Sequence, residues 1–133
     1  MTIGTLGVDS LSPVTAATVA TATSVAKSVP KYWGRYFSHA GNPPGQYRNT
    51  AEGPPLKTAG IRVLPYARQT KNVGGTASDG KQDGAANADA FLQEFGLALL
   101  KSQPGPYAMF LDVEPSDPLS PAYYGGWASS LID

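Results

Sequence analysis

Cysteine is absent from the 133-residue chain, and histidine occurs once. Without cysteine the chain forms no disulfide bonds and has no thiolate chemistry, but the compartment stays open because many exported proteins also lack cysteine. An excess of positive charge is missing too, since 10 Lys plus Arg balance 10 Asp plus Glu. Such a chain offers no electrostatic case for binding nucleic acid or an anionic membrane surface.

Long apolar runs are also missing. No stretch approaches the roughly 20 apolar residues that a membrane-spanning helix needs, so we expect no membrane insertion. Residues 1–5 lack the basic segment followed by an apolar core that marks an ordinary signal peptide. These observations leave the localisation undetermined. If the protein acts outside the cell, we expect it to be exported by a route that needs no ordinary signal peptide.

Residue types that bind metals are few and scattered. His39 lies in a proline- and glycine-rich stretch with no other metal-type ligand beside it. Asp79, Asp83 and Asp89 lack the spacing of a metal-binding loop, and we expect them to be solvated. No glycine-rich fingerprint follows the first expected strand, which argues against dinucleotide binding. We therefore expect neither a metal site nor a cofactor.

What the chain does contain is a fourfold alternation of short apolar runs and helical patterns. We expect strands over residues 3–8, 32–37, 61–66 and 107–113, and helices over 14–29, from about 54 to 60, over 85–101 and from 127 onward. Residues 68–83 are expected to form a long polar loop. Repeated strand–helix units predict an α/β fold with a parallel sheet and right-handed crossovers. The length suits one domain, residues 1–133.

Two architectures fit this pattern, an open doubly wound sheet and a segment of a (βα) barrel. The position of the unusual side chains favours the barrel, because they follow the expected strands in order: Asp9, then Arg35 and Phe37, then Tyr66, then Asp112 and Glu114. In a barrel the carboxyl ends of all strands meet at one mouth, where active sites of this fold are built.

The fourth strand ends in two carboxylates. Asp112 and Glu114 are two positions apart, so both point to the same side of the sheet. Like charges a few Å apart raise one pKa, which suits a general acid beside a second carboxylate. The alternative is a structural one, since a strand-end Asp often caps the following turn or helix.

Short motifs at the four expected strands carry a family resemblance. They are Gly7-Val8-Asp9, Gly34-Arg35-Tyr36-Phe37, Ala59-Gly60-Ile61 with Pro65-Tyr66, and Phe110-Leu111-Asp112-Val113-Glu114. With them, over nearly its whole length, the chain resembles the glycoside-hydrolase-like TIM barrels. That group includes the family 25 lysozymes (N-acetylmuramidases) and a related bacterial domain of unknown function. The resemblance implies that Glu114 is the general acid, that Asp112 is its partner, and that Asp9 lines the floor of the groove.

The implied activity is hydrolysis of the glycan of cell-wall peptidoglycan. Glycoside cleavage needs an acid and a second group that stabilises an oxocarbenium-like transition state, and Asp112 and Asp9 are both available for the second role. A protein of this kind would act extracellularly, at a cell surface or in a virion. The alternative is a non-catalytic barrel that binds glycan or serves as a structural module of a phage, injection-type or cell-surface assembly.

Further residues could contact the polysaccharide. Arg35, if it points inward, would hold a substrate oxygen or offset the carboxylates, whereas the alternative is a structural ion pair with Asp9. Phe37, Tyr66 and Tyr124 could provide flat platforms for sugar rings, while Trp127 is better explained by helix packing.

The number of strands limits this interpretation. A complete eight-stranded barrel takes about 250 residues, and this chain has material for four strands. Half a barrel would expose two sheet edges and the inner faces of its strands. We therefore expect the N-terminal half of a barrel, completed by the rest of a longer chain or by another copy.

Overall fold

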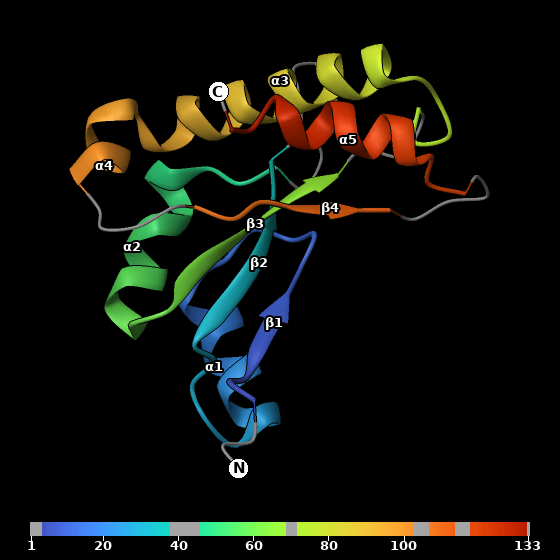
Figure 1. The fold of residues 1–133 in the computed structure, drawn as a ribbon. Helices are drawn as coiled ribbons and strands as arrows, with labels where there is room; N and C mark the ends of the chain where they lie inside the picture. Colours follow the sequence, from blue (N-terminus) through green and yellow to red (C-terminus); the bar gives the residue numbers. More distant parts are fainter. Residues whose placement is uncertain (1–3, 38–45, 69–71, 103–106, 114–117, 133) are drawn as a thin grey trace.

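The computed structural model describes residues 4–37, 46–68, 72–102, 107–113 and 118–132. Strands and helices alternate along these residues, as Figure 1 shows. In chain order they are β1 (Gly7–Asp9), α1 (Ala16–Ala26), β2 (Tyr32–Tyr36), α2 (Asn49–Ala59), β3 (Arg62–Arg68), α3 (Ala77–Phe95), α4 (Leu97–Ser102), β4 (Phe110–Asp112) and α5 (Pro121–Ser129).

The four strands form one parallel sheet in the order β1-β2-β3-β4. This confirms the predicted α/β fold with a parallel sheet. In the described part of the chain the sheet is open, with β1 and β4 at its edges, and it does not close into a barrel. Because the strands are parallel, their carboxyl ends lie at the same edge of the sheet.

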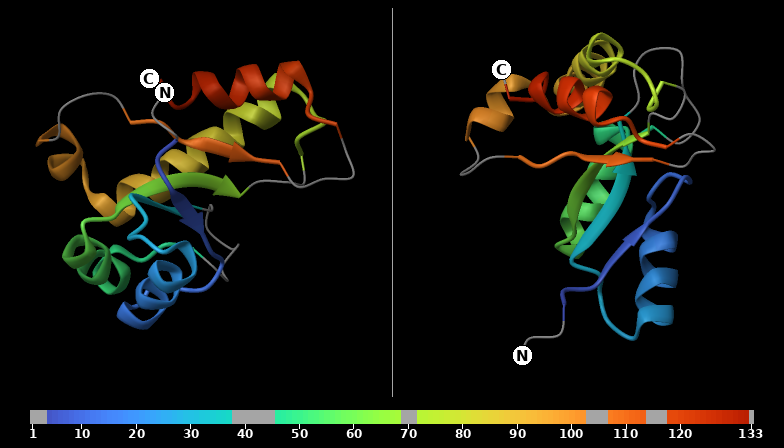
Figure 2. Two further views of the ribbon diagram at one scale, coloured as in Figure 1. Left: turned by 90° about the horizontal axis from the view of Figure 1, so that it is seen from below. Right: turned by 45° about the vertical axis from the view of Figure 1, so that its right-hand side comes forward.

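Successive side chains along each strand point to opposite faces of the sheet. Trp33 and Phe37 point to the face covered by helices, where they pack with Val14 of the segment before α1, Leu56 of α2 and Phe91 of α3. At the other end of the same face a second cluster joins β3 and β4 to α5. Figure 2 shows α3 and α5 running side by side along this layer. The opposite face of β2 carries Gly34 and Tyr36, as the period of two predicts.

Helix α2 begins earlier than expected and contains Pro54 and Pro55 in its interior. The two prolines leave the carbonyls of Thr50 and Ala51 without their helical donors, but both residues are exposed and water can replace the lost partners. Side-chain carboxylates hold the start of the helix. The backbone N–H of Arg48 donates to Glu52 at 3.0 Å, for example.

Helix α3 begins at Ala77, inside the stretch that we expected to be a loop, and ends at Phe95. Thr76 and Asp79 form a capping box at its start, with the Thr76 side chain and the Asp79 carboxylate each accepting a backbone N–H. Gly96, with a φ of 74°, separates α3 from α4. The expected helix over 85–101 is therefore two helices, and the capping box was the signal for the earlier start.

Helix α5 begins at Pro121 and not at Trp127, with Ser120 as its cap and proline in its first turn. Trp127 is buried and donates from Nε1 to Asn87 Oδ1 at 3.0 Å, which confirms its role in helix packing. Asp83 is not solvated as expected, because it is 7% exposed and accepts a hydrogen bond from the Tyr123 hydroxyl at 2.8 Å. No helix in the described part of the chain is both long and apolar enough to cross a membrane.

Candidate functional site

Two of the predicted carboxylates line one pocket on the face of the sheet that no described helix covers, which we call the pocket face. The pocket has a volume of about 470 Å³ and is lined by Asp9, Tyr36, Leu64, Tyr66, Phe110, Leu111 and Asp112. We call it the carboxylate pocket. Asp9 comes from β1 and Asp112 from β4, so the two acids belong to opposite edges of the sheet.

The strand register explains how residues so far apart in the sequence meet. Asp9 pairs with Gly34, Tyr36 with Tyr66, and Tyr66 with Phe110. Side chains at this level of the parallel strands point to one face near the carboxyl edge. The sequence predicted all three residues at strand ends. Asp9 and Asp112 end β1 and β4, whereas β3 continues past Tyr66 to Arg68, and all three line the common pocket.

The pocket is acidic, and its charges act on Tyr66. Burial raises the pKa of the Tyr66 phenol above its ordinary value, and the negative charges of Asp9 and Asp112 raise it further. The phenol therefore stays protonated at neutral pH and can donate a hydrogen bond. Ionised carboxylates only accept hydrogen bonds, so the pocket combines acceptors on two strands with a donor on a third.

Glu114, the predicted general acid, lies outside the described residues, as does His39. Asp112 is the last residue of β4 and is half-buried. Its side chain lines the pocket together with Asp9, whereas the predicted pairing with Glu114 remains a prediction.

Arg35 does not contact the carboxylate pocket. Its guanidinium donates twice to Glu52, from Nε to Oε2 at 2.7 Å and from Nη2 to Oε1 at 3.0 Å. Nη1 donates to the backbone carbonyls of Ser10 and Leu11. Because Arg35 is on the helix-covered face and 0% exposed, it neither binds substrate nor pairs with Asp9, and both of these expectations are wrong.

Phe37 and Tyr124 also lie away from the pocket. Phe37 is 0% exposed and packs in an aromatic cluster with Tyr47, Phe91 and Phe95, so it is a core residue and offers no platform for a sugar ring. Tyr124 is 49% exposed on α5, where it stacks on Trp127. It is not among the lining residues of the carboxylate pocket.

Four lining residues were not predicted from the sequence: Tyr36, Leu64, Phe110 and Leu111. For the first three the signal was the period of two, by which side chains alternate along a strand. Tyr36 is two positions from Gly34 on β2, and Phe110 is two positions from Asp112 on β4. Each therefore points to the same face of the sheet as that neighbour.

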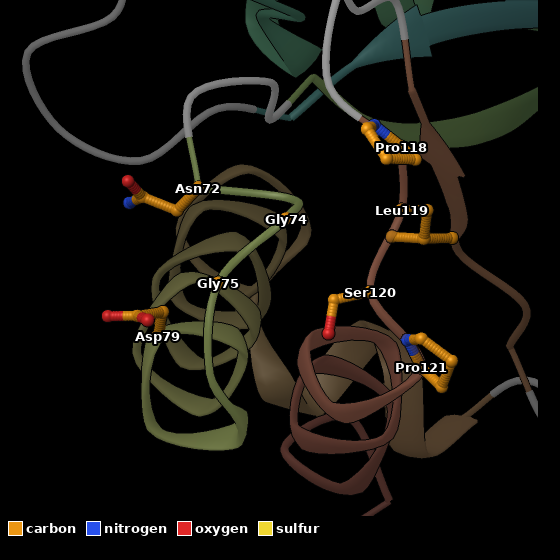
Figure 3. Close-up of a pocket in the computed structure, with 8 residues that line it drawn as sticks. All are labelled: Asn72, Gly74, Gly75, Asp79, Pro118, Leu119, Ser120 and Pro121. Atoms are coloured by element: carbon orange, nitrogen blue, oxygen red, sulfur yellow. The ribbon is translucent and has the colours of Figure 1, made fainter.

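A second pocket, of about 610 Å³, lies between the starts of α3 and α5, and Figure 3 shows its lining residues. Its carboxylate, Asp79, already accepts hydrogen bonds of 2.7 Å from the backbone N–H and the hydroxyl of Thr76. These bonds lower the pKa of Asp79. Ser120 likewise caps α5 through the N–H of Tyr123. Although this pocket is larger, the side chains of Asp79 and Ser120 are used in capping and that of Asn72 donates to Asp83. The carboxylate pocket is therefore the better candidate.

Within the described ranges no group of three or more His, Asp or Glu side chains is placed to hold a metal ion. The carboxylate pocket itself contains two acids, Asp9 and Asp112. Its donor set suits hydrogen bonding to a ligand with hydroxyl groups.

Comparison with known proteins gives one informative result. No family model matches the chain, and no curated protein matches it. A solved structure, the 1.07 Å crystal structure of an uncharacterized B. stearothermophilus protein, is similar with a TM-score of 0.73 and 24% sequence identity. The match covers 97% of this chain and 56% of the other. The chain thus spans about half the length of that protein and shares its α/β fold.

Proposed function

We propose that the chain is one half of a glycoside-hydrolase-like (βα) barrel. In a doubly wound sheet, helices cover both faces and the strand order reverses at a switch point. Here the order runs from β1 to β4 without reversal, and helices pack on one face only among the described residues. This arrangement supports the barrel, as does the similarity to part of a protein of greater length.

The proposed activity is hydrolysis of the glycan of cell-wall peptidoglycan. The observation that carries this proposal is that Asp9 and Asp112, from the two edge strands, line one pocket with Tyr66 at the carboxyl edge of the sheet. Retaining and inverting glycosidases alike act through two carboxyl groups that flank the scissile bond. The motif resemblance adds Glu114, two residues after Asp112, as the general acid.

In this proposal the three acids have different roles. Glu114 protonates the leaving glycosidic oxygen, while Asp112 and Asp9 stabilise the positive charge that develops on the sugar ring or orient the group that attacks it. The rings of Phe110 and Tyr36 border the same pocket and provide apolar surface for a sugar ring. Arg35 has no part in the chemistry because its charge is neutralised by Glu52.

The test is the release of new reducing ends from purified peptidoglycan, by this chain and by any longer polypeptide that contains it. We expect Glu114→Gln to lower the rate by about 10²–10⁴-fold, the usual contribution of a general acid. Asp112→Asn and Asp9→Asn should each lower it by about 10–10²-fold because they remove transition-state charge stabilisation.

A matched control is Asp89→Asn, because Asp89 is an exposed acid on α3 away from the pocket. Its rate should equal that of the wild type. Equal rates for the wild type and for all three variants, Glu114→Gln, Asp112→Asn and Asp9→Asn, would contradict the proposal. Binding to the cell wall without any release would instead favour the non-catalytic glycan-binding module.

A further inference from the structure

Gly34 leaves a gap in the sheet surface that the Tyr66 ring fills. A Cβ atom on Gly34 would lie 2.5 Å from Cε2 and 2.8 Å from Cζ of Tyr66, and 2.9 Å from Cβ of Asp9. Carbon atoms that are not bonded to each other do not approach so closely, so any side chain at this position would displace the ring or the aspartate. Glycine is required here for space, as at other close approaches in strands.

The consequence is a defined position for the Tyr66 hydroxyl. The ring leans from β3 across β2 toward β1, and Cζ, which carries the hydroxyl, and the Cβ of Asp9 crowd the same point above Gly34. Two other rings of the pocket hold it edge-on. The centroid of Tyr36 is 5.8 Å away and that of Phe110 is 6.1 Å away, with interplanar angles of 68° and 85°.

We propose that Gly34 and Tyr66 act as a pair, in which Gly34 seats the ring so that the Tyr66 hydroxyl donates a hydrogen bond to an uncharged, hydroxyl-rich ligand between Asp9 and Asp112. This inference rests on the proposed function for the identity of that ligand, a neutral N-acetylamino sugar. A sugar ring offers hydroxyl donors to the two carboxylates and oxygen acceptors to the phenol. The charges of the two aspartates disfavour an anionic ligand.

The groups that face the hydroxyl favour its protonated form. On β1 and β4 these are the carboxylates of Asp9 and Asp112, which together with burial raise the pKa of Tyr66. On β2 the neighbour is Tyr36. A phenol held in this setting is a donor throughout the neutral range, so the pair should act alike at pH 6 and pH 8.

The first experiment measures binding of the uncharged N-acetylglucosamine tetramer by calorimetry, with Glu114→Gln in every protein so that hydrolysis does not consume the probe. Tyr66→Phe keeps the ring and removes the donor, whereas Gly34→Ala keeps the donor and displaces the ring. Both should weaken binding by about tenfold, the loss of one hydrogen bond to a ligand. Gly125→Ala is the matched control, because a Cβ there would meet nothing within 4 Å.

The second experiment needs no ligand and follows the titration of Tyr66 by NMR with ¹³C-labelled tyrosine. In Asp9→Asn and in Gly34→Ala the pKa of Tyr66 should fall toward its ordinary value, because the phenol loses a neighbouring charge or moves away from it. An unchanged titration in Gly34→Ala would overturn the seating role. Wild-type affinity in Tyr66→Phe, or no binding of the tetramer by the parent protein, would overturn the donor role.

The two proposals fail in different ways. A parent protein that binds the tetramer, with both variants weakened, supports the Gly34–Tyr66 pair even when the wild type releases no reducing ends from peptidoglycan. Release of reducing ends at an unchanged rate in Tyr66→Phe would overturn the pair and leave the hydrolase proposal in place.

Discussion

The two faces of the sheet at β2 differ in the charged groups that they carry. On the helix-covered face, Arg35 is 0% exposed, and Glu52 accepts from two of its nitrogens while also accepting the backbone N–H of Val14 and Arg48. On the opposite face, Asp9 and Asp112 border an open pocket, and neither forms an ion pair among the described residues. The strand therefore separates a charge pair that holds the fold from acids available to a ligand.

This difference indicates which charges to connect with stability and which with function. A buried ion pair with every hydrogen bond made costs much to break, because the remaining partner is left charged and unsolvated. Like charges gathered at a pocket contribute little to folding, and sites of this kind commonly serve a ligand. Substitutions on the two faces should separate these effects.

The largest effect is expected from Glu52→Gln, which leaves the Arg35 guanidinium buried without a counter-charge. Unfolding by urea should show a loss of about 3–5 kcal/mol. The control is Arg48→Met, because the Arg48 side chain is 51% exposed in its 3.1 Å pair with Glu94. That change should cost less than about 1 kcal/mol, and equal losses for the two variants would contradict the contrast.

A smaller loss is expected where α3 and α5 touch within the helix layer. A Cβ at Gly80 would lie 2.0 Å from the carbonyl oxygen of Tyr123, so Gly80→Ala must push the helices apart, at about 1–3 kcal/mol. Gly125→Ala on the outside of α5 meets nothing within 4 Å and should raise stability by up to about 1 kcal/mol. Thermal unfolding of both variants checks the sign of each change.

Alkaline pH should weaken the helix-covered face next. Burial raises the pKa of Tyr47 above its ordinary value, and the charges of Glu52 and Glu94 raise it further. Above pH about 10 the unfolded chain loses this proton while the folded protein keeps it, so stability falls as pH rises, by at most about 1.4 kcal/mol per pH unit for one proton. Tyr47→Phe should make that decline shallower, and an unchanged slope would contradict this assignment.

The smallest effect on stability is expected on the pocket face. Asp9→Asn and Asp112→Asn should change the free energy of unfolding by less than about 0.5 kcal/mol, because each removes one of two like charges and breaks no ion pair among the described residues. Glycan hydrolysis or binding should nevertheless decrease. A loss of stability as large as that of Glu52→Gln would show that these acids are structural.

The sequence was sufficient for the parallel strand–helix order and for the division of β2 into two faces, because both follow from local periodicity. It also placed Asp9 and Asp112 correctly at strand ends, whereas β3 continues two residues past Tyr66 to Arg68. It could not identify the partner of Arg35, since Glu52 is 17 positions away and reaches it only through the packing of α2 on the sheet. It also could not predict that the Tyr66 ring packs against Gly34, because that contact depends on the pairing of β2 with β3.

The starts of α2 and α3 were misjudged for local reasons. Gly74, Gly75 and Gly80 made the beginning of α3 look like part of a loop, although Gly80 is small because α5 packs against it. Pro54 and Pro55 suggested a late start for α2, whereas contacts of Arg48 and Asn49 with acidic side chains from α2 and α3 hold the first turn. Tertiary contacts override intrinsic propensity in both places.

The central claim is that the pocket face of the sheet binds glycan through the carboxylate pocket. Backbone-amide NMR of the chain during addition of the N-acetylglucosamine tetramer tests it most directly. The account predicts shift changes that saturate and centre on Asp9, Gly34, Tyr66 and Asp112, with the amides of Arg48 and Gly84 unaffected. Changes confined to the pocket between α3 and α5, around Gly75 and Ser120, or no saturable change at all, would contradict it.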